Sequence, residues 1–255
     1  ALNLLYGSRI LFLVPLVFLG ATGIFSAFGF SFVLGLIFAL LLLARCSIRP
    51  ALGVDRVFLR EAWQFSAGAY VAGMLMSAPN MVIPIMVLHV LGAESTANYY
   101  ITYAIVSILF MIPYAFTTSL FVEGSHGGEM KKSVLRTLAS MFALLIPAIL
   151  GISLFGEQIL NLIGKDYVEG IALLRVLAFS ALFVSICQTF ISIAKVRNEI
   201  RSLIILSGFV SVGLLGLGYT MMNRFGLIGM GYAWLGTYVA GTLLVAAILK
   251  KKGWL

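Results

Sequence analysis

The sequence predicts an all-α membrane protein with about eight transmembrane helices, and three observations support this prediction. Of the 255 residues, 62% are hydrophobic and only 10% are charged, whereas soluble domains are about half apolar and about a quarter charged. The apolar residues form repeated stretches of about 17–25 residues, the length that crosses a hydrocarbon layer of about 30 Å. The basic residues fall between these stretches, as they do in loops that flank transmembrane helices.

The predicted spans follow one another with short connections. They cover residues 5–25, 30–44, 62–91, 97–122, 135–155, 171–194, 203–222 and 228–249. Two connections are amphipathic, residues 45–60 and residues 157–167, and both are expected to lie flat at a membrane surface, on opposite sides. The first of them marks the expected boundary between subdomains.

The distribution of Lys and Arg predicts the orientation in the membrane, because alternate connections fall on the same side. Fourteen of the 17 basic residues lie on the side of the N-terminus, and the other side holds only three, Lys165, Arg175 and Arg224. Both termini are therefore expected in the cytoplasm. A net charge of +8 arranged in this way predicts contact with lipid headgroups and not with nucleic acid.

Charged and metal-binding residues are rare within the predicted spans. No acidic residue lies in the middle of a span, and the only histidines, His89 and His126, are expected on opposite sides of the membrane. Because intramembrane carboxylates mark most proton and cation relays, the chain offers no such relay by itself. The sequence thus predicts no metal, no cofactor and no enzyme, since it lacks a group of residues suited to general acid–base catalysis.

Uncharged polar side chains form stripes on three predicted helices, at the three- and four-residue spacing of one helical face. The stripes lie in residues 66–80, 100–117 and 185–192. Two interpretations stay open: hydrogen bonds that hold neighbouring helices together, or a hydrated cavity of hydroxyls and aromatic faces, which suits sugar rings. The candidate cavity residues are Tyr70, Ser77, Asn80, Tyr103, Ser107, Tyr114, Thr117 and Gln188.

Two ordered sets of motifs resemble a known family. The first set is PNMVIPIMVLHVLG at residues 79–92, ANYY at 97–100, IP at 112–113 and SLFVEG at 119–124. The second is Pro147, LFG at residues 154–156, GKDY at 164–167 and LLRVL at 173–177. Together they resemble the polysaccharide-exporting flippases of the multidrug/oligosaccharidyl-lipid/polysaccharide (MOP) superfamily, over nearly the whole chain.

The resemblance implies part of a protein with two lobes, which contain twelve or fourteen helices and alternately expose a central cavity. On this template the chain resembles the last eight helices. Residues 1–44 would be a helix pair from the end of the first lobe, residues 45–60 a cytoplasmic amphipathic linker, and residues 61–255 the six-helix second lobe. The first four helices of the same protein would then be missing partners, in keeping with a chain whose Ala1 lies directly against an apolar span.

The resemblance also implies a function: a flippase that moves lipid-linked oligosaccharide or polysaccharide precursors across the cytoplasmic membrane, with membrane lipids and the lipid-linked sugar as partners. Arg60, Arg136 and Arg175 are candidates for contact with the phosphate groups near the cavity mouth; membrane orientation or headgroup contact is the alternative role. Two other functions stay open, an ion-coupled multidrug-type exporter of the same superfamily and a membrane-embedded transferase.

Overall fold

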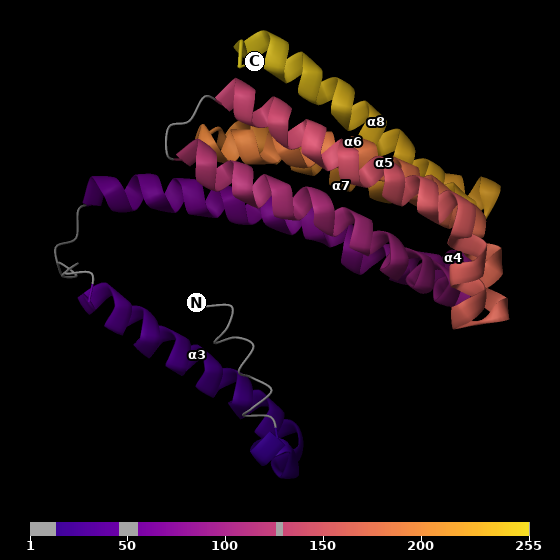
Figure 1. The fold of residues 1–255 in the computed structure, drawn as a ribbon, viewed down its shortest axis with the longest axis horizontal. Helices are drawn as coiled ribbons and strands as arrows, with labels where there is room; N and C mark the ends of the chain where they lie inside the picture. Colours follow the sequence, from indigo (N-terminus) through magenta and orange to yellow (C-terminus); the bar gives the residue numbers. More distant parts are fainter. Residues whose placement is uncertain (1–13, 46–55, 126–129, 255) are drawn as a thin grey trace. The chain divides into compact units, whose positions relative to one another are not determined.

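The computed structural model describes residues 14–45, 56–125 and 130–254, and all the regular structure in these ranges is helical. The chain divides into two compact units, Ala1–Arg56 and Val57–Leu255. Within the described residues, six helices are long and apolar enough to cross a membrane. The protein is therefore a multi-pass membrane protein, and Figure 1 shows its helices.

One long helix dominates the described part of the first unit. A short 3-10 helix, η1 (Val17–Leu19), leads into α3 (Gly20–Arg45), and the two meet at Gly20, whose φ of 61° costs glycine little. The predicted boundary between the first and second spans, residues 26–29, is wrong, because these residues lie inside α3. The hydroxyl of Ser26 donates to the carbonyl of Thr22 at 2.9 Å, so the helix satisfies this polar group without a turn.

The helix α4 (Arg56–Ser125) contains two spans. Its 70 residues would extend about 105 Å as a straight helix, more than three times the thickness of the hydrocarbon layer. Gly92 interrupts it with φ 87° and ψ −179°, a conformation that is accessible mainly to glycine. The chain reverses there (Figure 1), and the halves on either side, residues 56–91 and 93–125, correspond to the predicted third and fourth spans.

The remaining helices of the second unit correspond to the last four predicted spans. They are α5 (Met130–Ile163), α6 (Ile171–Val196), α7 (Ile200–Phe225) and α8 (Leu227–Lys252), with a 3-10 helix, η2 (Lys165–Gly170), between α5 and α6. The prediction of a separate surface segment at residues 157–167 is wrong for residues 157–163, which continue α5. This end of α5 is packed: Leu160 is fully buried, and a Cβ at Gly156 would lie 2.9 Å from Ile171 Cδ1 of α6.

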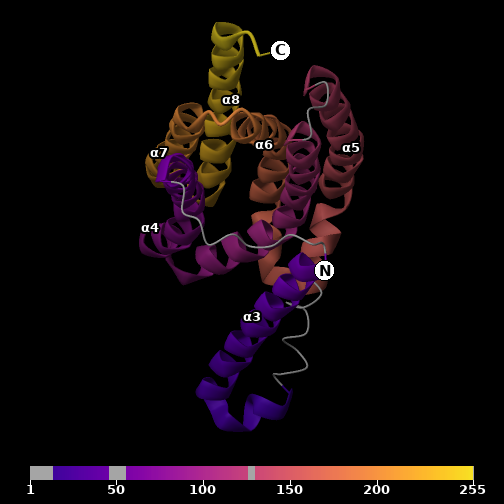
Figure 2. The ribbon, with the colours of Figure 1, turned by 90° about the vertical axis from the view of Figure 1, so that its left-hand side faces the viewer.

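Small residues allow the helices of the second unit to approach closely, as in other membrane bundles. The close contacts include Gly68 of α4 against Ile200 of α7, Gly213 of α7 against Thr237 of α8, and Gly241 of α8 against Cys187 of α6. A hydrogen bond of 2.9 Å from Ser192 Oγ to the carbonyl of Thr117 joins α6 to the second half of α4. Figure 2 shows α8 next to α6 and α7, the two helices against which it packs.

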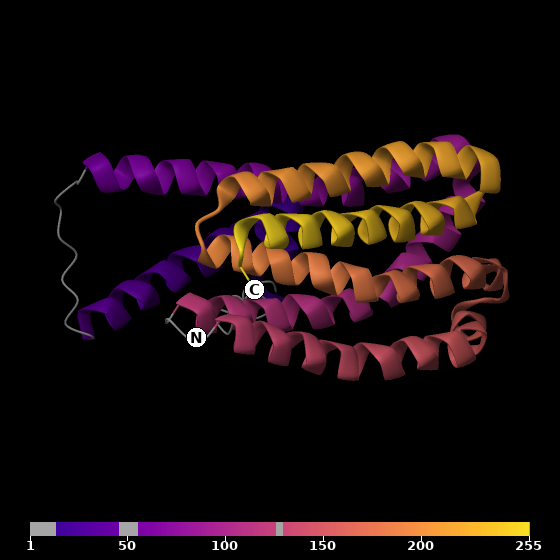
Figure 3. The ribbon, with the colours of Figure 1, turned by 90° about the horizontal axis from the view of Figure 1, so that it is seen from above.

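Successive connections of the second unit alternate between its two ends. In Figure 3 the last turns of α4, the connection after α6 and the end of α8 lie at one end, and the connections after α5 and α7 lie at the other. This alternation is the one that the count of basic residues assumed. Residues 46–55 of the predicted linker lie outside the described residues, while Arg45 ends α3 and residues 56–60 form the first turns of α4.

Candidate functional site

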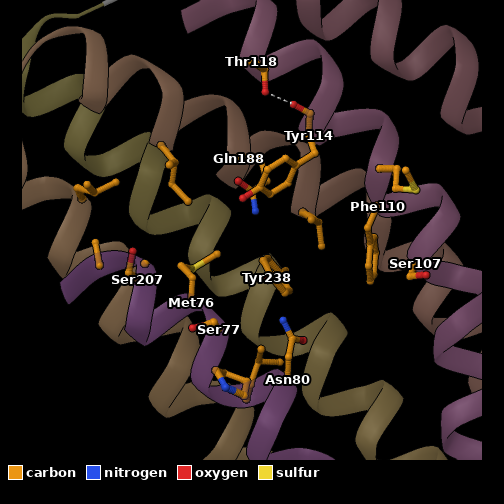
Figure 4. Close-up of a pocket in the computed structure, with 18 of the residues that line it drawn as sticks. Met76, Ser77, Asn80, Ser107, Phe110, Tyr114, Thr118, Gln188, Ser207 and Tyr238 are labelled. Atoms are coloured by element: carbon orange, nitrogen blue, oxygen red, sulfur yellow. Dashed lines mark hydrogen bonds between the residues drawn. The ribbon is translucent and has the colours of Figure 1, made fainter. Parts of the chain in front are cut away.

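The second unit contains a cavity of about 590 Å³ between helices that are distant in sequence. Both halves of α4 line it together with α6, α7 and α8, and Figure 4 shows ten of its side chains labelled. Its volume falls within the roughly 300–1,000 Å³ that is usual for small-molecule sites. All the lining residues belong to the second unit, so this cavity is a feature of that unit alone.

The polar stripes of the two halves of α4 meet at this cavity. Ser77 and Asn80 line it from the first half, and Tyr103, Ser107 and Tyr114 line it from the second half. Tyr103 Oη donates a hydrogen bond of 2.8 Å to Asn80 Oδ1, so the two stripes touch directly. One hydrogen bond thus ties the two spans together at the wall of the cavity.

The hydroxyl groups of the wall keep hydrogen-bonding capacity for a ligand. Ser77 donates to the carbonyl of Met74 at 3.1 Å, and Ser107 donates to the carbonyl of Ala104 at 2.7 Å. Each hydroxyl oxygen can still accept a hydrogen bond after its proton is used in this way. Ser207 Oγ is fully buried and has no hydrogen-bond partner among the described residues.

An aromatic cluster forms the most rigid part of the wall. The ring of Trp234 lies 5.4 Å from Phe110 in a stacked arrangement, 5.6 Å from Tyr238 and 5.8 Å from Tyr103, measured between centroids. All four residues line the cavity. Because three neighbouring rings pack against Trp234, this residue holds this part of the wall together.

The α6 side of the cavity carries the charge. Gln188 and Lys195 both line it, and neither side chain makes a hydrogen bond or an ion pair with another described residue. They lie seven residues apart on one helix, which places them about 10.5 Å apart along its axis and on the same face. Among the described residues that line the cavity, Lys195 is the only one with a formal charge, and it is exposed in the last turn of α6.

The candidate residues from the sequence divide between the cavity and its surroundings. Six of the eight line it, Ser77, Asn80, Tyr103, Ser107, Tyr114 and Gln188. Tyr70 does not, and it is 69% exposed. Thr117 does not either: it is buried, its hydroxyl donates to the carbonyl of Pro113 at 2.7 Å, and its own carbonyl accepts from Ser192. The hydroxyl of Thr117 thus bonds within its own helix, and it is Ser192 of the third stripe that shows the interhelical bonding of the alternative interpretation.

The three candidate phosphate-contacting arginines lie elsewhere. Arg60, Arg136 and Arg175 are exposed, and none of them lines the cavity. The cation that does line it, Lys195, was counted in the sequence only as evidence of orientation. A signal for it was present, because Lys195 follows Gln188 and Ser192 at steps of four and three residues and so extends the stripe of the sixth span by one turn.

Solved structures with the same fold are membrane transporters. The crystal structure of MATE in complex with MaD5 matches with a TM-score of 0.80 and 15% identity, over 98% of this chain and 60% of that chain. An outward-facing multidrug resistance MATE family transporter of the MOP superfamily matches with a TM-score of 0.76 and 16% identity, over 96% of this chain and 60% of that one. A third match is a MOP superfamily transporter from Pyrococcus furiosus Vc1 (DSM3638), described as having a binding pocket of reverse polarity that suggests a different function. It matches with a TM-score of 0.73 and 16% identity, over 96% of this chain and 60% of that chain.

Sequence comparison adds no closer relationship. No protein-family model matches the chain, and no curated protein matches it. The chain spans about 60% of the length of the solved structures that it matches. The fold of this chain is therefore that of the MATE transporters of the MOP superfamily, over about three fifths of their length.

Proposed function

We propose that the chain is the larger part of a transporter that moves lipid-linked oligosaccharide or polysaccharide precursors across the cytoplasmic membrane by alternating access. The observation that carries this proposal is the polar part of a cavity lining that is otherwise apolar: it has hydroxyl, phenol and amide groups with one lysine and, among the described lining residues, no carboxylate. Neutral donors and acceptors match the hydroxyls of sugars. The ammonium group of Lys195 matches the phosphate groups that link a sugar to its lipid.

The same chemistry argues against cationic drugs as substrates. Lys195 has no ion pair with a described residue, and such an uncompensated lysine would repel an organic cation. An exporter of cations would need a carboxylate facing the substrate, which would have to come from outside the described part of the chain. The multidrug exporter remains the second candidate, because one structure with this fold is a multidrug resistance transporter.

The two-lobe arrangement completes the proposal. In it, residues 61–255 form the second lobe, residues 45–60 the cytoplasmic linker and residues 1–44 the end of the first lobe, with four more helices of the same protein ahead of them. The coverage of about 60% of the matched structures supports this, since eight helices of twelve or fourteen are a similar share. Rocking of one lobe against the other would then expose the cavity alternately to the two sides of the membrane.

The orientation belongs to the same proposal. The fourteen basic residues on one side place both termini in the cytoplasm. Single-cysteine variants at positions 132 and 165, in a background that lacks Cys46 and Cys187, are expected to react from opposite sides of the membrane. Only position 165 should react with an impermeant reagent outside the cell, and strong external labelling at position 132 would reverse the proposed orientation.

The decisive experiment is reconstitution of the complete gene product in liposomes with a labelled lipid-linked oligosaccharide. Lys195→Gln is expected to lower the rate of appearance of the label in the opposite leaflet by about tenfold or more, because a charged hydrogen bond contributes about 1.5–3 kcal/mol. Arg201→Gln, which removes an exposed charge near the same end of the bundle, should leave the rate unchanged.

Three outcomes would change the proposal. Transport of a cationic dye without movement of the lipid-linked sugar would favour the multidrug exporter. Robust flipping by the 255-residue chain alone would contradict the two-lobe arrangement. Covalent conversion of the sugar donor would favour a transferase, for which the described residues show no group of three or more His, Cys, Asp or Glu side chains that could hold a metal ion.

A further inference from the structure

A second hollow lies at the end of the second unit where α5 begins and α6 and α8 end. It is a groove of about 570 Å³ lined by Met130, Lys131, Lys132, Leu135, Arg197 and Trp254. It shares no lining residue with the cavity described above. Three of its six lining residues are cations, and none is acidic.

Trp254 is held firmly at the base of this groove. The chain turns at Gly253, with φ 60°, and the N–H of Trp254 then donates to the carbonyl of Leu249 at 3.3 Å. Its indole stacks on Phe190 with centroids 5.9 Å apart, and only 8% of the residue is exposed. Tryptophan favours the level of the lipid headgroups, so the groove lies where a headgroup would be found.

Arg197 is held in place by the same tryptophan. Its Cζ lies 5.1 Å from the centroid of the indole ring, and its Nη2 donates to the carbonyl of Trp254 at 3.2 Å. These contacts order the guanidinium but do not neutralise it, because both partners are uncharged. The remaining N–H groups of Arg197 are still available to an anion.

Two acidic side chains of the described residues have partners close to the groove. Glu199 pairs with Lys252, and Glu123 Oε1 accepts a hydrogen bond of 2.9 Å from Ser133 Oγ. Within the described residues, neither Lys131 nor Lys132 forms an ion pair. The groove therefore presents three cations that form no ion pair with a described residue, and it lies at the beginning of α5, whose first turn carries the positive end of the helix dipole.

We propose that this groove binds the phosphate of an anionic membrane phospholipid. Lys131, Lys132 and Arg197 would contact the headgroup phosphate, and the apolar side chains of Met130 and Leu135 would contact the first part of an acyl chain. Basic pockets between transmembrane helices bind anionic headgroups in this way. The groove shares no lining residue with the central cavity, so the proposal does not depend on what that cavity transports.

The test uses the 255-residue chain in nanodiscs that contain equal amounts of phosphatidylglycerol and phosphatidylcholine. Lipids retained after extraction into detergent are counted by native mass spectrometry. The wild type should retain phosphatidylglycerol preferentially. Lys131→Gln/Lys132→Gln should weaken this preference by roughly tenfold or more, since each cation near a headgroup contributes about a factor of five.

The matched control is Lys250→Gln/Lys251→Gln. This variant removes two adjacent, exposed lysines at the same end of the unit, and neither of them lines the groove. It should keep the wild-type preference. An equal loss in both variants would show general surface attraction, and an unchanged preference in both would show that the groove binds no anionic lipid; either result overturns the proposal.

A competition experiment distinguishes two lipids that could supply the phosphate, a bulk phospholipid and a polyprenyl carrier lipid. A polyprenyl diphosphate is added at increasing amounts to the wild type in phosphatidylglycerol nanodiscs. Retained phosphatidylglycerol should persist when the two lipids are equimolar. Its complete displacement by an equimolar polyprenyl diphosphate would identify the carrier lipid as the occupant and would overturn the assignment to bulk phospholipid.

Discussion

The substitution Trp234→Ala tests whether the aromatic cluster fixes the cavity wall. Between transmembrane helices there is little hydrophobic driving force, so close packing provides much of the stability. Trp234 makes ring contacts with Phe110, Tyr238 and Tyr103 at 5.4, 5.6 and 5.8 Å. At about 0.5–1.5 kcal/mol for each aromatic pair, the three contacts put the loss of stability at roughly 1.5–4.5 kcal/mol.

The assay is thermal unfolding of the purified chain in detergent. A protein of this size loses about 2–4 °C in Tm for each kcal/mol, so a loss near the middle of the range corresponds to about 6–12 °C. Trp63→Ala is the matched control, because Trp63 is 73% exposed and should shift the Tm by no more than about 2 °C. Equal shifts for the two variants would refute the claim that Trp234 holds the wall together.

Two further predictions concern the contacts between spans. Tyr103→Phe removes the hydrogen bond to Asn80 and should lower stability by about 1 kcal/mol; Tyr100→Phe, on the exposed side of the same helix, should have no measurable effect in the same melting assay. Gly213→Ala places a Cβ 2.7 Å from the methyl group of Thr237 in α8 and should lower the stability by about 1–3 kcal/mol. Gly216→Ala is the control: its Cβ would have no atom within 4 Å, so the stability should stay the same or rise slightly. Equal melting temperatures for the two variants would contradict the close approach of α7 and α8.

The sequence alone determined the spans of the second unit. Each of residues 62–91, 97–122, 135–155, 171–194, 203–222 and 228–249 lies within helical segments of the structure. Hydropathy succeeds here because the cost of placing a peptide segment in lipid depends mainly on its own side chains. Hydropathy did not locate the boundary between the first and second spans. Apolar residues continue through the turn at Gly20, and only the backbone conformation of this glycine marks the turn. The polar stripes were also visible, because helical spacing alone places residues on one face.

Only the tertiary structure decided what those stripes do. It brought Asn80 to Tyr103, placed Lys195 at the cavity, and left Tyr70 and the three candidate arginines outside it. It also joined α6 to α4 through the hydroxyl of Ser192 and the carbonyl of Thr117. The physical reason is that the direction in which a polar face points depends on the rotation of each helix about its axis. That rotation is set by close packing at small residues such as Gly213 and Gly241, whose partners lie on other helices, and no local pattern in the sequence names those partners.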